Sequence, residues 1–224
     1  MTASDGRHVS VVRHRAGRPL IKQHVVAAVS ALLAVAGACR SASAVSSSIG
    51  EGDLVFQTSR SAQSLAIQKA THSRYSHMGV VLERRGRLVV FEAESTVRNT
   101  PLEAWLARGE GGHYVVKRLH APLSAQQVER LRQAAKAFDG KPYDATFGWS
   151  DRRMYCSELV WKLYDRALGI SIGRLQKLGD FDLSDPLVQA KLRERYGKAI
   201  PLQETVISPQ AMFAWPVLDT VIEH

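Results

Sequence analysis

The alternation of apolar and polar positions after residue 50 predicts a sheet with flanking helices. The run 52–57, GDLVFQ, predicts a first strand, and the runs 77–82 and 88–93 predict two more. The segment Glu83-Arg84-Arg85-Gly86 separates the last two at hairpin length, so these two strands should pair antiparallel. Further strands are expected over 113–119 and, more briefly, over 205–207.

Apolar residues at helical spacing place helices between and after these strands. Ser124 and Gln127 form a capping box ahead of an apolar stripe that ends before Gly140. Gly169 is the expected stop of a second helix over 156–168. Shorter or weaker helices are expected over 61–71, 101–105, 185–197 and from 208 onward. Strands grouped together with helices around them are typical of an α+β domain.

The first 44 residues differ from the rest of the chain. Basic residues precede an apolar run over 25–38, which is short for a bilayer-spanning helix, and Ala42-Ser43-Ala44 follows it. This pattern predicts a signal peptide over 1–44 and a domain over 45–224 that is exported to the periplasm or cell envelope. Two alternatives stay open: an uncleaved anchor helix, and a lipoprotein signal that ends before Cys39 and anchors the protein there.

The net charge of +9 suggests at first a nucleic-acid partner. Residues 1–44 hold six of the cations and one anion, which leaves 24 cations and 20 anions in the rest of the chain. There is no long basic run in that part and no basic stripe interleaved with aromatic residues. A nucleic-acid partner is therefore not expected.

Cys156 is the one cysteine left if the chain is cleaved after Ala44, since cleavage removes Cys39. A lone cysteine is either a small buried apolar residue or a nucleophile. Cys156 begins a predicted helix, where free backbone N–H groups stabilise a sulfur anion and a developing oxyanion. This position favours the nucleophile.

A cysteine nucleophile requires a base that later acts as an acid, and His77 fits both roles at the start of an apolar strand. Gly79, two residues along on the same face, is expected to leave open space beside it. Glu92 interrupts the apolar run of the paired strand and is the candidate that orients the imidazole, with Glu94 as its substitute. The competing histidines are expected at the solvated surface: His72, His113 and His120.

The motif GKPY at 140–143, followed by YCSELV at 155–160, resembles the active-site segment of NlpC-type papain-like cysteine peptidases. In those enzymes the histidine follows the cysteine, whereas His77 and Glu92 precede it here, so the order is circularly permuted. Together with the segments GDLVFQ at 52–57 and THSRYSH at 71–77, these motifs make the chain similar to the YiiX-like permuted branch from residue 52 to about residue 207. The leader and the last dozen or so residues lie outside this resemblance.

The resemblance implies a permuted papain-like fold, in which an antiparallel sheet packs against helices and the nucleophile begins a helix. It implies a triad of Cys156, His77 and Glu92, and it places the Tyr143 hydroxyl opposite the nucleophile, to assist the oxyanion or hold substrate. Glu158 departs from the pattern, because the unpermuted peptidases usually have glycine there.

Cleavage of an amide or ester bond through an acyl-Cys156 intermediate is the function expected. A cell-wall peptide and the acyl group of a lipid or lipoprotein are both open as substrates, as are acyltransferase or thioesterase activity and peripheral membrane association. The alternative is a non-catalytic envelope protein that binds a fatty acid or peptide in the same groove. No cofactor is expected, and a zinc site on Cys156 and His77 lacks the usual ligand spacing.

Overall fold

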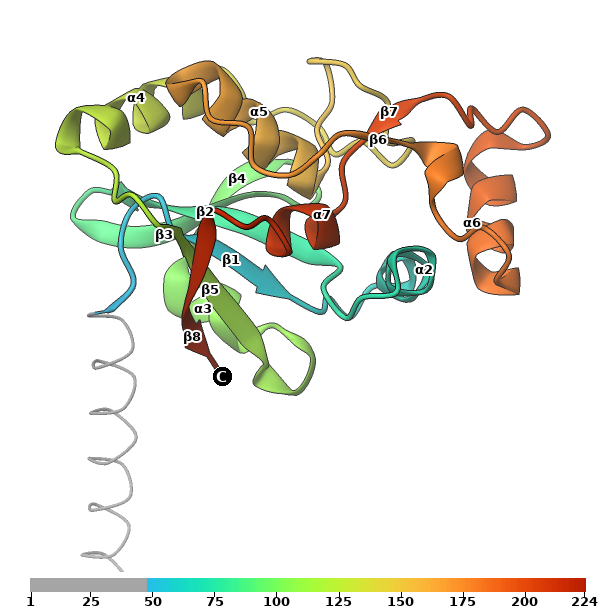
Figure 1. Cartoon of the computed structure of the whole chain (residues 1–224), viewed down its shortest axis with the longest axis horizontal. Coiled ribbons are helices and arrows are strands. Elements are labelled where there is room, and N and C mark those ends of the chain that lie inside the picture. The colour runs from blue at the N-terminus through green and yellow to red at the C-terminus, as the bar shows by residue number, and fades with distance from the viewer. Residues whose placement is uncertain (1–47) are drawn as a thin grey trace, which may run out of the picture. The chain divides into compact units, whose positions relative to one another are not determined.

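The computed structural model describes residues 48–224, so the expected signal peptide and Cys39 lie outside the described residues. A six-stranded antiparallel sheet of order β4-β3-β2-β1-β5-β8 forms the centre of this part of the chain (Figure 1). Its strands are β1 (Leu54–Gln57), β2 (His77–Arg84), β3 (Arg87–Ala93), β4 (Val97–Pro101), β5 (Tyr114–Leu119) and β8 (Leu218–Glu223). A second, two-stranded sheet pairs β6 (Gln176–Lys177) with β7 (Thr205–Val206).

Helices cover both faces of the large sheet, as the α+β prediction requires. They are α2 (Ala62–Thr71), α3 (Leu102–Ala107), α4 (Ala125–Ala135), α5 (Cys156–Leu168), α6 (Pro186–Tyr196) and α7 (Pro209–Phe213), with 3₁₀ turns at Glu110–Gly112 and Leu178–Asp180. In Figure 1, α4 and α5 lie on one side of the sheet and α3 on the other, while α2 and α6 lie side by side at one end.

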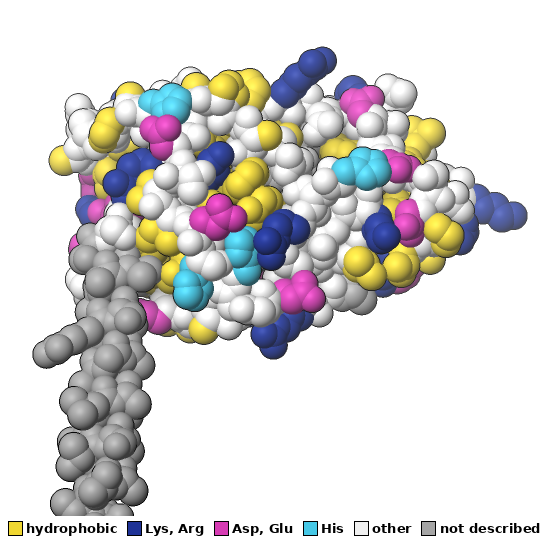
Figure 2. All heavy atoms as spheres, turned by 60° about the horizontal axis from the view of Figure 1, so that its bottom comes forward, with side chains coloured by type: hydrophobic (Ala, Val, Ile, Leu, Met, Phe, Trp, Pro, Cys, Tyr) yellow, Lys and Arg dark blue, Asp and Glu magenta, His cyan; other side chains and the backbone are white. Residues whose placement is uncertain are grey.

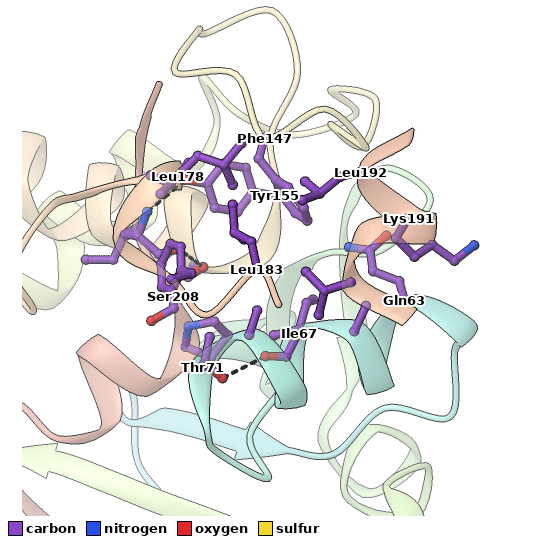
Figure 3. Close-up of a pocket in the computed structure, with 18 of the residues that line it drawn as sticks. Gln63, Ile67, Thr71, Phe147, Tyr155, Leu178, Leu183, Lys191, Leu192 and Ser208 are labelled. Carbon is purple, nitrogen blue, oxygen red and sulfur yellow. Dashed lines mark hydrogen bonds between the residues drawn. The ribbon is translucent and has the colours of Figure 1, made fainter. Parts of the chain in front are cut away.

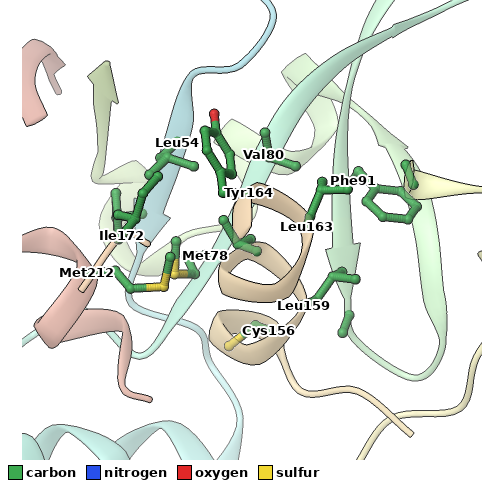
Figure 4. Close-up of a cluster of buried hydrophobic side chains, with 14 of the residues drawn as sticks. Leu54, Met78, Val80, Phe91, Cys156, Leu159, Leu163, Tyr164, Ile172 and Met212 are labelled. Atoms are coloured by element: carbon green, nitrogen blue, oxygen red, sulfur yellow. The ribbon is translucent and has the colours of Figure 1, made fainter. Parts of the chain in front are cut away.

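The main core lies between α5 and the sheet. Apolar residues at alternate positions of β1 and β2 face α5, among them Phe56, Met78 and Val80, and Leu159 and Leu163 of α5 pack against them (Figure 4). Each fully buried side chain of this kind contributes about 1.5–3 kcal/mol relative to exposure. α3 packs against β3 and β4 on the opposite side of the sheet (Figure 1).

The hairpin between β2 and β3 confirms the predicted antiparallel pair. Its turn consists of Arg85 and Gly86, with φ of 53° and 74°. Two residues of positive φ make the tight turn whose twist matches that of the flanking strands. The turn sets the register in which Val80 lies opposite Phe91.

Two strands of the sheet were not predicted from the sequence. β4 is an edge strand that ends at Pro101, where proline is tolerated because the outer side of the strand has no partner within residues 48–224. β8 pairs with β5, so the last residues, which lie outside the motifs of the family resemblance, complete the other edge. Most of β8 is exposed or half-buried without an apolar alternation, which is why its pattern gave no signal.

The surface shown in Figure 2 carries lysine and arginine side chains interspersed with aspartate and glutamate rather than gathered by sign. Within residues 48–224, no helix combines the length and the apolar character that crossing a membrane requires.

Candidate active site

Cys156 is the first residue of α5, and its neighbours fix it in place. The backbone N–H of Ile207 donates to the Tyr155 hydroxyl at 3.0 Å, and Ser157 Oγ donates to the Ile207 carbonyl at 2.7 Å. Both residues that flank Cys156 are thus bound to one backbone unit. The cysteine is only 4% exposed, and it lies in the first turn of a helix, where backbone N–H groups lack intrahelical partners.

Glu158 supports the same helix start. Its Oε2 accepts from the Tyr155 N–H at 3.3 Å, and its Oε1 lies 2.7 Å from Lys162 Nζ. Burial raises the pKa of Glu158 to about 7, against the hydrogen bond from Lys162, which lowers it. The carboxylate has no exposed surface, so this departure from the peptidase pattern serves the helix rather than the path of a substrate.

His77 lies between the cysteine and a carboxylate. Its Nε2 is 2.6 Å from Glu92 Oε2, and Cys156 is close enough to act on the same ring. Burial lowers the pKa of His77, but the hydrogen bonds and charges of Cys156 and Glu92 outweigh it and raise the pKa to about 9. The structure therefore brings together the three residues that the sequence nominates as a triad.

Glu92 has further hydrogen-bond partners besides His77. Trp105 Nε1 donates to Oε2 at 2.9 Å, the Arg108 guanidinium donates to the same oxygen, and Thr100 Oγ1 donates to Oε1 at 2.6 Å. Burial raises the pKa of Glu92, but His77, Arg108 and Thr100 together lower it to about 2. Glu92 is thus ionised and fixed in orientation.

Sequence reasoning missed these three supporting residues, because they come from β4, α3 and the residue after α3. Glu94, the substitute for Glu92, is half-exposed and pairs with Arg98 at 2.8 Å. It does not reach the imidazole.

Gly79 does not leave open space, contrary to the sequence expectation. A Cβ at this position would lie 2.4 Å from Val90 Cγ1 and 3.3 Å from Glu92 Cβ. The missing side chain instead lets β3 approach β2 closely, and this approach brings Glu92 to the imidazole.

Tyr143 lies in the site as well. Its hydroxyl accepts a hydrogen bond from Gln63 Nε2 at 2.7 Å. Burial raises the pKa of Tyr143, and the charge of Cys156 raises it further. With His77, Arg60 and Ser76, it lines a polar groove. The sequence placed it near the cysteine, but no sequence signal indicated Gln63.

The other histidines lie away from this cluster. His72 and His120 are exposed and pair with Asp182 at 3.1 Å and Asp219 at 2.6 Å. The expectation of a solvated surface is wrong for His113, whose ring stacks on Tyr75 and whose Nε2 is buried without a hydrogen-bond partner among residues 48–224.

Cys156 also lies in the wall of an apolar pocket, which Figure 3 shows. The empty space of the pocket amounts to about 690 Å³ when the open solvent at its mouth is included. Its wall comes largely from α2, α6 and the segments next to them and includes Ala66, Ile67, Phe147, Leu183, Val188 and Leu192. Lys191 and Arg195 add cations to this wall. The sequence gave no sign of the pocket, because its walls meet through long-range packing.

In the described part of the chain, no group of three or more His, Cys, Asp or Glu side chains is arranged to hold a metal ion. The chemistry that the arrangement supports directly is that of a thiol nucleophile with an imidazole acid and base.

Known proteins of similar sequence and structure show the family of this chain. The chain is 58% identical over 173 residues to the uncharacterized protein YiiX of Escherichia coli strain K12, and the match covers 77% of this chain and 86% of that protein. It is also similar to the crystal structure of metalloprotein yiiX from Escherichia coli O157:H7, with a TM-score of 0.76, 58% identity, and coverage of 78% of this chain and 97% of that one.

A family model described as permuted papain-like amidase enzyme, YaeF/YiiX, C92 family, matches residues 48–222. The match includes β8, so the family resemblance extends beyond the limit near residue 207 that the motifs suggested. This chain therefore belongs to the YaeF/YiiX family of permuted papain-like amidases.

Proposed function

We propose that this protein is a cysteine hydrolase that cleaves an amide or ester bond through an acyl-Cys156 intermediate. The observation that carries the proposal is the position of His77, whose Nε2 lies 2.6 Å from Oε2 of ionised Glu92 and whose pKa is raised by both Glu92 and Cys156. With a pKa of about 9, the imidazole is protonated at neutral pH and can serve as an acid.

The proposed reaction has two steps. The Cys156 sulfur attacks the substrate carbonyl, the C–S bond forms, and the carbonyl π electrons move to oxygen. When this tetrahedral species collapses, the bond to the leaving amine or alcohol breaks and His77 donates its proton to that group. In the second step His77 takes a proton from water, which attacks the thioester, releases the acid and restores the sulfur anion.

The apolar pocket beside Cys156 favours an acyl chain over a cell-wall peptide as the group transferred to sulfur. Its wall carries aliphatic and aromatic side chains on which a peptide backbone would leave polar groups unpaired, whereas an alkyl chain gains about 0.8 kcal/mol for each buried CH₂. The polar groove around His77 and Arg60 then lies where the leaving group departs. A lipid or lipoprotein amide or ester fits both sides.

The similar protein from Escherichia coli O157:H7 is described as a metalloprotein. The proposed reaction uses only side chains of residues 48–224 of this chain.

Chromogenic p-nitrophenyl esters of acetate and octanoate test the proposal. Wild-type protein should release nitrophenolate from both, and Cys156→Ala from neither. Ala66→Phe narrows the pocket and should slow hydrolysis of the octanoyl ester more than hydrolysis of the acetyl ester. The rate with the acetyl ester controls for loss of folding. Full turnover by Cys156→Ala contradicts the proposal, and an unreactive thiol supports the binding-protein alternative. Equal slowing of both esters by Ala66→Phe removes the acyl-chain assignment.

We further propose that the protein is exported to the periplasm or envelope, on the basis of the pattern over residues 1–44. The mass of the mature protein isolated from cell fractions separates the three outcomes. A chain that begins at residue 45 supports signal cleavage, a lipid-modified Cys39 at the new terminus supports anchoring, and an intact leader supports an uncleaved helix.

A further inference from the structure

A chain of hydrogen bonds joins α6 to the tyrosine of the active site. Arg195 Nη2 donates to Gln63 Oε1 at 2.6 Å, and Gln63 Nε2 donates to the Tyr143 hydroxyl at 2.7 Å. The three residues come from α6, α2 and the loop before α5. Gln63 lines both the polar groove and the apolar pocket, so the chain passes between the two halves of the site.

The direction of every bond in this chain is fixed by chemistry. A guanidinium has donors and no acceptor, so Gln63 must turn its carbonyl oxygen to Arg195 and its NH₂ group to Tyr143. An amide NH₂ donates and does not accept, so the tyrosine oxygen must be the acceptor. The hydroxyl proton of Tyr143 therefore points away from Gln63. Among residues 48–224, no protein acceptor takes this proton.

The free proton is available to a group that enters the polar groove. The charge of Cys156 acts directly on Tyr143, and Tyr143 shares the polar groove with His77. Burial raises the pKa of the phenol, so the hydroxyl keeps its proton. Hydrogen bonds in such a series polarise one another, and the cation at the far end strengthens the last donor.

We propose that Gln63 and Arg195 are positioning residues that hold the Tyr143 hydroxyl as a hydrogen-bond donor to the carbonyl oxygen under attack by Cys156. The inference rests on the proposed function. As the C–S bond forms and the carbonyl electrons move to oxygen, the O–H of Tyr143 donates to that oxygen and keeps its proton. Arg195 is itself held over the Phe147 ring, with 4.7 Å from its Cζ to the ring centroid.

Gln63→Glu exchanges the donor and acceptor roles in the hydrogen bond to Tyr143, while the side chain keeps its shape. A carboxylate keeps the pairing with Arg195 but accepts from Tyr143, so the hydroxyl proton turns away from the substrate. Two rates separate this effect from a change in the thiol itself. Acylation by p-nitrophenyl octanoate creates an oxyanion, whereas alkylation by iodoacetamide displaces iodide and creates none. The measured quantity is the ratio of the acylation rate to the alkylation rate.

We expect Gln63→Glu and Tyr143→Phe each to lower this ratio by about tenfold or more, since loss of one oxyanion donor costs roughly 100- to 1,000-fold in other hydrolases. In the Tyr143→Phe background, Gln63→Glu should lower it no further. Gln189→Glu adds the same charge on the exposed side of α6 and is the matched control. Its ratio should equal that of the wild type.

Three results overturn the inference: a wild-type ratio in Gln63→Glu, an equal fall in both rates, or a further fall in the double variant. Cys156→Ala distinguishes this failure from that of the proposed function. If Cys156→Ala releases no nitrophenolate while Gln63→Glu behaves as the wild type, only the positioning role is lost. If Cys156→Ala is fully active, both proposals fail.

Discussion

His77 Nε2 lies 2.6 Å from Oε2 of Glu92, a carboxylate with no exposed surface. The two residues share one face of the β2–β3 pair, because Val80 lies opposite Phe91 in the antiparallel register. With Nε2 bound to the carboxylate, the other ring nitrogen is left for Cys156. An orienting carboxylate of this kind fixes the imidazole and stabilises its protonated form.

Glu92→Gln should lower turnover of an ester substrate by about tenfold to a thousandfold, because the protonated imidazole loses its counter-charge. The pKa of His77 should also fall. As pH rises, the activity of the variant should therefore decline at a pH below about 9, which is the pKa of His77 in the intact pair. The pH–rate profile measures both effects. Glu94→Gln removes an exposed carboxylate that pairs with Arg98, and its profile should match the wild type. Equal effects of the two substitutions would contradict the assignment of Glu92.

The His77–Glu92 pair should stabilise the fold most between about pH 4.5 and 6.5. His77 has its pKa raised from 6.5 to about 9, so its contribution is complete below 6.5 and is lost as pH rises through 9. Glu92 has its pKa lowered from 4.5 to about 2, so its contribution is complete above 4.5 and is lost as pH falls through 2.

Urea unfolding of the wild type and His77→Gln at pH 5.5 and 9.5 measures this contribution. The difference in unfolding free energy should be on the order of 3 kcal/mol at pH 5.5 and smaller at pH 9.5. A difference that grows toward pH 9.5 would refute the assigned shift.

Gly79→Ala should weaken both stability and activity. The added Cβ meets Val90 Cγ1 at 2.4 Å and Glu92 Cβ at 3.3 Å, so β3 must shift away from β2. Overpacking of this kind costs about 1–3 kcal/mol, and the shift also moves Glu92 from the imidazole. Gly50→Ala is the control, since its Cβ would meet Arg118 at an ordinary 3.6 Å. Urea unfolding that places both variants at wild-type stability would show that the strands have more room than the structure indicates.

Glu158→Gln should change stability in a way that depends on pH. The pKa of Glu158 is raised from 4.5 to about 7, so its contribution is complete below 4.5 and is lost as pH rises through 7. Glutamine resembles the protonated form and escapes this loss, since the lowering effect of Lys162 is already included in the pKa of about 7. Relative to the wild type, the variant should gain stability between pH 5 and 8. A constant difference across this range argues that Glu158 is already ionised at pH 5.

Local patterns were enough to predict the elements that carry the nucleophile and its base. The apolar stripe of α5 and the αL conformation of Gly169 at its end bear out the expected helix, and the capping box of Ser124 and Gln127 is present at the start of α4. The pairing of His77 with Glu92 follows from alternation along two neighbouring strands, which is a local property as well.

The supports of the site depend on packing between distant segments. Trp105 and Arg108 reach Glu92 only because α3 packs on the face of the sheet opposite α5. Gln63 and Arg195 meet through the packing of α2 on α6, and the apolar pocket forms in the same place. Neither periodicity nor short motifs contain this information, so the supporting partners of the triad could be assigned only from the fold.

Mass spectrometry of the intact protein, quenched in acid after mixing with p-nitrophenyl octanoate, tests the acyl-enzyme most directly. The account predicts the added mass of one octanoyl group on wild-type protein, located by digestion to the peptide that contains Cys156, and no added mass on Cys156→Ala. Nitrophenolate release without an adduct on the wild type, at an undiminished rate in Cys156→Ala, would contradict it.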